Sequence, residues 1–372
     1  MSAQPQHQEA LVRHDALRRH LAAVLAAAGL PVKGAAIVSD SLVDADLRGV
    51  HSHGTVRVPY YVERLRTGGN NARPRIRVVS EGPAYALLDG DDGMGQVVAQ
   101  RCVRVAVEKS RASGIGWVIC RRSSHFGAAA YWAVQAVSEG MIGFAATNTI
   151  ASMFPFGGAA QVVGNNPICY AIPAGKNPPV ILDMAMSVAA GGKVAVLKAK
   201  GQPIPEGWLL DSLGRPTTDP NAVASGGAVA PIGGPKGFGL ALMMDVICGV
   251  LSGANFAGTF PPRGPADRFG SFGAAADARF GNGHNFMAID ISRFMPLGEF
   301  TTRMEALVAT VKSARRAPGV DRIYLPGEIE HDLKRARLEA GIPLPATVLE
   351  ALAETALELG VEPLASAPVH GG

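Results

Sequence analysis

The sequence contains few of the residues that mark several large protein classes. Only four of its 372 residues are cysteines, and no two of them form a CxxC pair. This pattern argues against a disulfide scaffold or a cysteine-rich zinc module. Three of the cysteines stand in apolar surroundings, which predicts buried free thiols and a reducing, cytoplasmic compartment. Aromatic residues make up only 6%, so a core built mainly from Ala, Val, Leu and Ile is expected.

Charge of one sign and long apolar runs are also scarce. The formal net charge is +4, and no dense Lys/Arg run or interleaving of basic and aromatic residues occurs. We therefore expect no nucleic-acid partner. Residues 1–20 lack the apolar core of a signal peptide. The longest apolar stretch, near residues 240–251, contains Asp245 and is too short to span a bilayer, so we expect no membrane partner.

The familiar nucleotide-binding loops are missing as well. No GxGxxG segment opens a helix after a strand, and no glycine-rich loop ends in Gly-Lys-Ser/Thr. Residues 233–237 resemble neither motif, because Pro235 removes a backbone donor just before Lys236. The sequence therefore does not favour a Rossmann fold.

Hydrophobic periodicity predicts helices at both ends of the chain and a sheet between them. Strand-like and helix-like segments alternate from about residue 84 to residue 182, which indicates an α/β or α+β domain and leaves the strand directions open. We expect a helical domain from residues 1–75 plus 290–372, a sheet-containing domain from 76–240, and a helical and loop subdomain from 241–289. Within these, residues 201–231 are expected to form a long ordered loop and 261–283 a mobile surface segment.

The first candidate for chemistry is the segment that holds Ser52, His53 and Arg57. Ser52 can hydrogen-bond the adjacent imidazole, His53 titrates near neutral pH as a general acid/base must, and the planar fork of Arg57 suits a carboxylate. A capping serine with two ordinary loop histidines is the plain alternative. His51 and His53 also form an HxH pair, so a metal-dependent hydrolase that uses His51, His53 and His125 stays open.

The second candidate is the segment around His125. It follows an apolar strand and precedes a predicted helix, which places His125 at the carboxyl end of a strand. The small residues Gly127, Ala128 and Ala129 would let backbone N–H groups approach a phosphate at the helix N-terminus. A tight strand–helix turn without further function is the alternative.

Single polar residues after other strand-like runs are weaker candidates. Asn148 and Asn165 offer amide groups but are common turn residues. Asp183 is either a helix cap or a partner for an imidazole or a ribose. Lys236, among glycines, is the cation best suited to a cofactor phosphate.

Together these motifs are similar to those of the malate/L-lactate dehydrogenase family of the second type. That family includes ureidoglycolate, sulfolactate and diketogulonate dehydrogenases and piperideine-2-carboxylate reductases. The likeness runs from about residue 10 to residue 345. It rests on Asp46-Leu47-Arg48-Gly49, Ser52-His53-Gly54, Arg57, Ser124-His125-Phe126-Gly127-Ala128, Thr147-Asn148, Gly164-Asn165-Asn166-Pro167, Leu182-Asp183-Met184-Ala185, Pro205-Glu206-Gly207-Trp208, Gly233-Gly234-Pro235-Lys236-Gly237-Phe238-Gly239 and Pro326-Gly327-Glu328.

The resemblance implies a non-Rossmann NAD(P)-binding mixed-sheet domain flanked by helical segments from both chain ends, and a homodimer. It implies that His125 transfers the proton, that Ser52 and His53 form a relay pair, and that Arg57 clamps the substrate carboxylate, with Asn148 and Asn165 as further substrate contacts. Asn165 stands where threonine is usual in the family. The NAD or NADP contacts would be His125, Phe126, Gly127, Ala128, Ala129, Thr149, Asp183, Met184, Ala185, Lys236, Pro326, Gly327 and Glu328, with no metal.

The function expected from these observations is hydride transfer between NAD(P) and a small 2-hydroxy or 2-oxo acid. Within the same family, NADPH-dependent reduction of a cyclic imine carboxylate, such as a piperideine- or pyrroline-2-carboxylate, is the alternative. The sequence chooses neither the acid nor between NAD and NADP.

Overall fold

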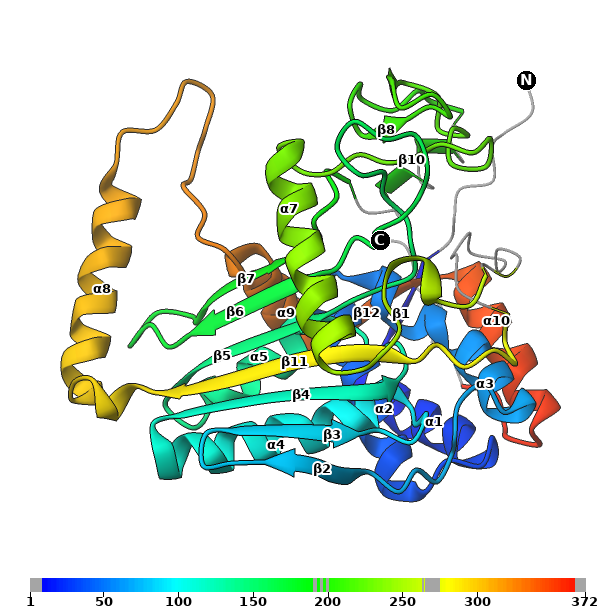
Figure 1. The fold of residues 1–372 in the computed structure, drawn as a ribbon, viewed down its shortest axis with the longest axis horizontal. Coiled ribbons are helices and arrows are strands. Elements are labelled where there is room, and N and C mark those ends of the chain that lie inside the picture. Colours follow the sequence, from blue (N-terminus) through cyan, green and yellow to red (C-terminus); the bar gives the residue numbers. More distant parts are fainter. Residues whose placement is uncertain are drawn as a thin grey trace.

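A seven-stranded mixed sheet forms the centre of the molecule (Figure 1). The computed structural model describes residues 9–189, 193–194, 197–198, 201–262, 264 and 275–364. Every neighbouring pair of strands in the sheet is antiparallel except β3 and β4, which are parallel. The strands lie in the order β2 (Arg77–Glu81), β3 (Tyr85–Asp89), β4 (Ile115–Ser123), β11 (Asn282–Asp290), β5 (Met141–Thr147), β6 (Ile168–Ile172) and β7 (Val180–Met184). The expected mixed α/β architecture is therefore confirmed.

One face of the sheet is covered by α4 (Gly95–Ser113) and α5 (Ala129–Val137) (Figure 1). Side chains along strand β4 accordingly alternate between the two faces, and Val118 and Cys120 are fully buried on the covered face. Glycines let the helices lie directly on the strands. A Cβ at Gly116 would lie 2.0 Å from the Ala106 carbonyl oxygen, and one at Gly143 would lie 2.0 Å from that of Ala133.

The other face carries α7 (Pro235–Met244), which continues as the π-helical segment Asp245–Leu251 (Figure 1). Residues 201–231, expected as a long loop, contain a small three-stranded sheet. Its strands are β8 (Leu209–Leu210), β9 (Pro216–Thr217) and β10 (Ala228–Val229).

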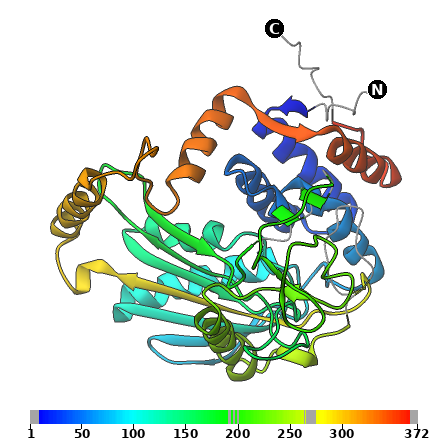
Figure 2. The same cartoon turned by 90° about the horizontal axis from the view of Figure 1, so that it is seen from above.

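A helical layer from both chain ends packs beside the sheet (Figure 2). Its two ends are joined by antiparallel pairing of β1 (Glu9–Val12) with β12 (Ile342–Pro345). Leucines and valines of both ends share one buried core. The helices of this layer are α1 (His14–Ala27), α2 (Val32–Leu47), α3 (Val58–Thr67), α9 (Glu328–Ala340) and α10 (Ala346–Glu358), with the 3₁₀ turns η1 (His51–His53) and η2 (Thr55–Arg57) between α2 and α3.

Two segments differ from the sequence expectation. Residues 282–290, expected within a helical and loop subdomain, form β11 between β4 and β5 in the middle of the sheet. Helix α8 (Leu297–Ser313), expected with the terminal helices, stands at the opposite edge of the molecule (Figures 1 and 2). Residues 263 and 265–274 of the expected mobile segment 261–283 lie outside the described residues. The division into three domains remains a prediction.

Among the described residues, no helix is both long and apolar enough to cross a membrane.

Candidate active site

The turn that carries Ser52, His53 and Arg57 is built around a buried aspartate. Asp46, near the end of α2, has no exposed surface, and its carboxylate accepts hydrogen bonds from the Thr55 backbone N–H at 2.7 Å and the Thr55 hydroxyl at 2.6 Å. A Cβ at Gly54 would lie 2.0 Å from Oδ1 of Asp46, so only glycine fits there. This anchoring fixes the position of η1 and η2, which hold the three candidate residues.

Within this turn the candidates contact one another. The hydroxyl of Ser52 and Nδ1 of His53 are 2.9 Å apart, which confirms the expected hydrogen bond. Nε of Arg57 donates to the Ser52 carbonyl oxygen at 2.6 Å. The guanidinium therefore has a fixed position beside the imidazole, although the two residues are four positions apart.

The second histidine approaches the first from the end of a sheet strand. His125 follows β4, and its ring stacks on that of His53, with centroids 5.4 Å apart and an interplanar angle of 26°. Two segments separated by about seventy positions of sequence thus bring both imidazoles and the Arg57 guanidinium to one place. The convergence expected from the sequence is present within a single chain.

Two residues of this site were not expected from the sequence. The hydroxyl of Tyr61 lies 2.6 Å from Nδ1 of His125, and Nε2 of Gln96 donates to that hydroxyl at 3.1 Å. Tyr61 lies four residues after Arg57 on α3, so helical spacing could have suggested it. Gln96 lies at the start of α4 and carried no local signal.

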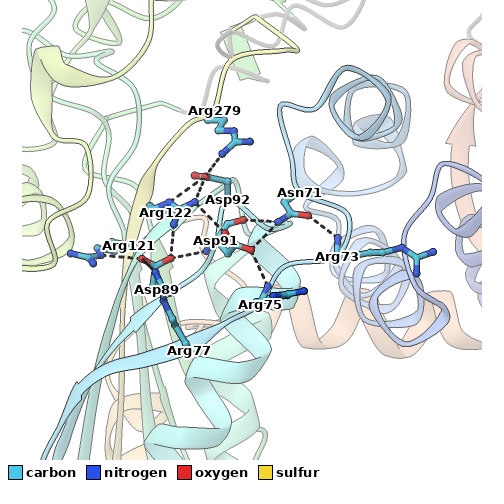
Figure 3. Close-up of polar contacts among 10 residues, drawn as sticks. All are labelled: Asn71, Arg73, Arg75, Arg77, Asp89, Asp91, Asp92, Arg121, Arg122 and Arg279. Carbon is cyan, nitrogen blue, oxygen red and sulfur yellow. Dashed lines mark hydrogen bonds and ion pairs between the residues drawn. The ribbon is translucent and has the colours of Figure 1, made fainter.

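An arginine–aspartate network supports the end of β4 just before His125 (Figure 3). Arg122 is its centre and forms ion pairs with Asp89 at 3.1 Å, Asp91 at 3.2 Å and Asp92 at 2.7 Å. The backbone N–H of Asp92 donates to the Arg122 carbonyl oxygen at 2.8 Å. The β3–α4 loop is thereby tied to the strand that leads into the site. Arg279 joins the same network through Asp92 at 2.8 Å.

His284, on β11 next to the candidate site, has a structural role. It has no exposed surface, and its Nδ1 and Nε2 each lie 2.7 Å from a hydroxyl, of Thr147 and Ser123 respectively. The ring of Phe126 stacks on it at 4.6 Å. Burial lowers the pKa of His284 to about 3, so this imidazole is neutral at physiological pH.

Burial also determines the charge of the two facing histidines. Desolvation, aided by the nearby charge of Arg57, lowers the pKa of His53 to about 3. Desolvation followed by the influence of His53 and Arg57 holds the pKa of His125 well below its ordinary value. Both rings are therefore neutral near pH 7, and each can accept a proton from a bound hydroxyl.

Small residues and a carboxylate meet at the N-terminus of α5. Gly127 adopts a φ of 81°, and Ala128 caps the helix. The Ala130 backbone N–H donates to Oδ2 of Asp183 at 2.8 Å. This region therefore combines small residues at a positive helix end with a hydrogen-bond acceptor, which suits a phosphate next to a ribose.

Hydrogen bonds connect several of the remaining cofactor candidates to the segment around Asp183. Pro326 accepts a hydrogen bond from the Ile181 N–H at 2.9 Å, so residues 326–327 lie beside β7. Past Met184 and Ala185, the Met186 N–H donates to the Asn165 carbonyl oxygen at 2.8 Å. The Thr149 hydroxyl in turn donates to Oδ1 of Asn165 at 3.0 Å.

Lys236 is connected to these cofactor candidates through the loop that precedes it. It is exposed near the start of α7, and the loop before it is joined to this region by the hydrogen bond from the Ile232 N–H to the Met186 carbonyl oxygen, at 2.8 Å.

Two candidates have other roles in the structure. Asn148 has no exposed surface, and its amide binds Asp245, the Asn255 carbonyl oxygen and the Gly283 N–H, so it joins segments of the fold and is not accessible to a substrate. The Glu328 carboxylate is occupied by Lys312, Arg322 and the Leu325 N–H, which lower its pKa to about 2 against the effect of burial. Sequence alone could not reveal that these polar groups already had partners.

The arrangement does not favour the metal-dependent hydrolase. Nδ1 of His51 lies 2.8 Å from the Asp46 carboxylate and Nε2 lies 3.0 Å from the Arg337 guanidinium, so both nitrogens already have partners other than a metal ion. In the described part of the chain, no three His, Cys, Asp or Glu side chains are grouped closely enough to hold a metal ion.

Known proteins of one family resemble this chain over nearly its whole length. Residues 12–353 match the malate/L-lactate dehydrogenase family model. Malate dehydrogenase from Pyrococcus horikoshii is 42% identical, with 95% of this chain and 96% of that protein covered. L-sulfolactate dehydrogenase from Methanocaldococcus jannaschii is 39% identical, with coverage of 91% and 94%. Ureidoglycolate dehydrogenase (NAD(+)) from Escherichia coli O157:H7 is 34% identical, with coverage of 93% and 96%.

The fold gives the same result. The solved structure of malate dehydrogenase from Pyrococcus horikoshii superposes with a TM-score of 0.85 at 39% identity, covering 98% of this chain and 99% of that one. Sequence and fold agree, and both support the resemblance drawn from the motifs. This chain belongs to the malate/L-lactate dehydrogenase family.

Proposed function

We propose that this enzyme moves a hydride between a nicotinamide dinucleotide and C2 of a small 2-hydroxy or 2-oxo acid. The observation that carries the proposal is the convergence of His53, His125 and Arg57 next to the N-terminus of α5. A guanidinium beside two neutral imidazoles offers one group for a carboxylate and another for the proton of a hydroxyl.

The residues around α5 fit a dinucleotide. The glycine and alanines at residues 127–129 put no bulky side chain at the N-terminus of α5, where a phosphate would bind, and the exposed carboxylate of Asp183 can accept hydrogen bonds from ribose hydroxyls. Thr149, Met184, Ala185, Lys236, Pro326 and Gly327 would complete the contacts. When bound, the nicotinamide ring would supply the hydride acceptor or donor. NAD and NADP are both compatible with these residues.

The side chains of the enzyme position the acid and handle its proton. Arg57 binds the substrate carboxylate with its two terminal nitrogens, while its Nε stays on the Ser52 carbonyl oxygen. During oxidation of a hydroxy acid, His125 accepts the proton of the 2-hydroxyl as the C2–H bond breaks. In the reverse direction, the imidazolium of His125 returns this proton to the forming alkoxide. His53, oriented by Ser52, hydrogen-bonds the same oxygen, and Asn165 is the remaining amide candidate for a substrate contact.

Kinetics with two histidine variants test the proposal. Initial rates are measured with NADH and with NADPH against a panel of 2-oxo acids, including oxaloacetate and 3-sulfopyruvate, and against cyclic imine carboxylates. His125→Ala and His53→Ala should each lower kcat by about 10²–10⁴. If both variants kept wild-type turnover on the best substrate, the proton-transfer assignment would be wrong. Activity on the imines alone would favour the cyclic imine reductase.

We also infer a homodimer from the face of the sheet that α7 only partly covers. Cross-strand partners place large side chains in one row over six strands: Tyr85, Trp117, Met287, Phe144, Tyr170 and Leu182. Tyr85 is 51% exposed and Trp117 40%, which is costly for aromatic side chains that face water. Light scattering on the purified protein should give twice the chain mass, whereas a monomer would contradict this inference.

A cytoplasmic location is also proposed, because all four cysteines are free and buried, as expected in a reducing compartment.

A further inference from the structure

A buried polar chain leads from His125 away from the substrate side. It runs from Nδ1 of His125 to the Tyr61 hydroxyl and on to the amide of Gln96. Tyr61 is 1% exposed and Gln96 has no exposed surface. Oε1 of Gln96 is buried as well, and it accepts no hydrogen bond from the part of the chain that the structure describes. A buried acceptor without a donor costs about 1–3 kcal/mol, so its presence needs a reason.

The direction of these hydrogen bonds sets the position of the proton on His125. Because the Gln96 amide donates to the Tyr61 oxygen, the Tyr61 O–H is free to donate to Nδ1 of His125. A neutral imidazole that accepts at Nδ1 carries its own proton on Nε2. In this arrangement the Nε2–H of His125 can hydrogen-bond the oxygen on C2 of a 2-oxo acid, but Nε2 has no lone pair with which to take the proton of a 2-hydroxy acid.

The protonated form of His125 needs the opposite arrangement. Both ring nitrogens of an imidazolium carry protons, so Nδ1–H must donate to the Tyr61 oxygen. The Tyr61 O–H then needs an acceptor. Half a turn of the Gln96 amide brings Oε1, the atom without a donor, to the place that Nε2 now occupies.

We propose that Gln96 is a positioning residue that selects the protonation form of His125 through Tyr61. With its amide nitrogen toward Tyr61, Gln96 holds His125 in the resting Nε2–H tautomer, in which Nε2 cannot accept a proton. With its amide oxygen toward Tyr61, the ring carries its proton on Nδ1, so Nε2 can take the proton of the hydroxyl, and the imidazolium that forms keeps the same hydrogen bonds. Gln96 itself gains and loses no proton, so the proton taken from the hydroxyl stays on His125 until it is released. This inference rests on the proposed role of His125.

The surroundings of His125 make such support necessary. The titratable and charged groups that face its ring are His53 on η1, Arg57 on η2, Tyr61 and Arg64 on α3, and His284 on β11. The two arginines repel an imidazolium, and desolvation adds to their effect. Hydrogen bonding through Tyr61 is therefore the stabilising contact identified for the charged ring.

The test is ¹⁵N NMR of the full-length enzyme labelled at histidine, with the His125 signals assigned by their loss in His125→Ala. In the wild-type enzyme without substrate, neutral His125 should carry its proton on Nε2. In Gln96→Glu, a carboxylate replaces the amide and accepts the Tyr61 O–H. His125 should then be protonated on Nδ1, and its pKa should rise by about one unit or more. In Gln96→Met, which lacks a donor, the preference for Nε2–H should be lost.

Two controls separate this effect from general damage. Gln100→Met changes a glutamine one turn further along α4, which pairs with Gln135 at 2.9 Å, and should leave the His125 signals unchanged. In a Tyr61→Phe background, adding Gln96→Glu should have no further effect on the protonation of His125.

The acid limb of kcat/KM for hydroxy-acid oxidation should move to higher pH in Gln96→Glu and should not do so in Gln100→Met. Unchanged His125 signals in Gln96→Glu and Gln96→Met would overturn the inference, even if His125→Ala were inactive. An active His125→Ala enzyme would instead overturn the proposed function.

Discussion

The replacement Gly95→Ala tests how tightly the position of His125 is controlled. Gly95 begins α4, directly against the segment that ends in His125. A Cβ there would lie 2.2 Å from the Ser124 carbonyl oxygen and 2.4 Å from that of His125. Ordinary contact requires 3.4 Å or more. The alanine must therefore push the Ser124–His125 backbone away by about 1 Å, at a cost of about 1–3 kcal/mol for overpacking.

Such a displacement should affect catalysis more than it affects the fold. A misplacement of about 1 Å in a catalytic group can cost about 10²-fold in rate, so kcat/KM for the preferred acid should fall by about this factor. The assay is steady-state oxidation of the reduced nicotinamide, with circular dichroism and thermal melting to check folding. Gly298→Ala is the matched control, because it also lies in the first turn of a helix and a Cβ there meets nothing within 4 Å. Wild-type kcat/KM in a folded Gly95→Ala enzyme would refute the close packing on which this reasoning depends.

Three further predictions follow from other parts of the structure. Arg57→Ala should raise KM for the acid by about 10–100-fold, because a charge-assisted hydrogen bond to the carboxylate is lost. Arg57→Lys should recover only part of the affinity, and an unchanged KM in Arg57→Ala would place the carboxylate elsewhere. His284 is buried and neutral with a pKa of about 3, against 6.5 when unfolded, so the unfolded chain binds the extra proton. The free energy of unfolding should then drop by up to about 1.4 kcal/mol per pH unit as the pH falls through this window. In His284→Gln, the free energy of unfolding, measured by urea denaturation at each pH, should depend less on pH over the same range. Glu328→Gln should lower stability by about 1–3 kcal/mol without changing KM for the dinucleotide, because its carboxylate serves Lys312 and Arg322; a changed cofactor KM alone would restore the cofactor assignment.

Local signals in the sequence were sufficient for much of the fold. Helix α2 lies in the helical segment expected at the start of the chain, and Pro31 and Gly49 limit it at both ends. Strand β11 was missed because it follows a Gly/Ala/Pro-rich stretch and pairs with strands more than a hundred residues earlier in the chain. No local pattern encodes such a pairing.

The candidate site likewise contains some residues that the sequence could connect and others that it could not. Ser52, His53 and Arg57 interact over short spacings, so residue chemistry was enough to connect them. Tyr61 reaches His125 across sixty-four positions, a contact that depends on how α3 meets the end of β4. Asn148 was misjudged for the converse reason, because sequence cannot tell an amide that is free for a ligand from one that the fold has already bound.

A crystal structure of the enzyme with reduced dinucleotide and an unreactive analogue of the 2-oxo acid tests the central claim most directly. We expect the carboxylate of the analogue on the Arg57 guanidinium, the oxygen on its second carbon within hydrogen-bond distance of Nε2 of His125, and the nicotinamide ring on the other side of that carbon. An analogue bound with its carboxylate away from Arg57, or with neither histidine in reach of that oxygen, would contradict it.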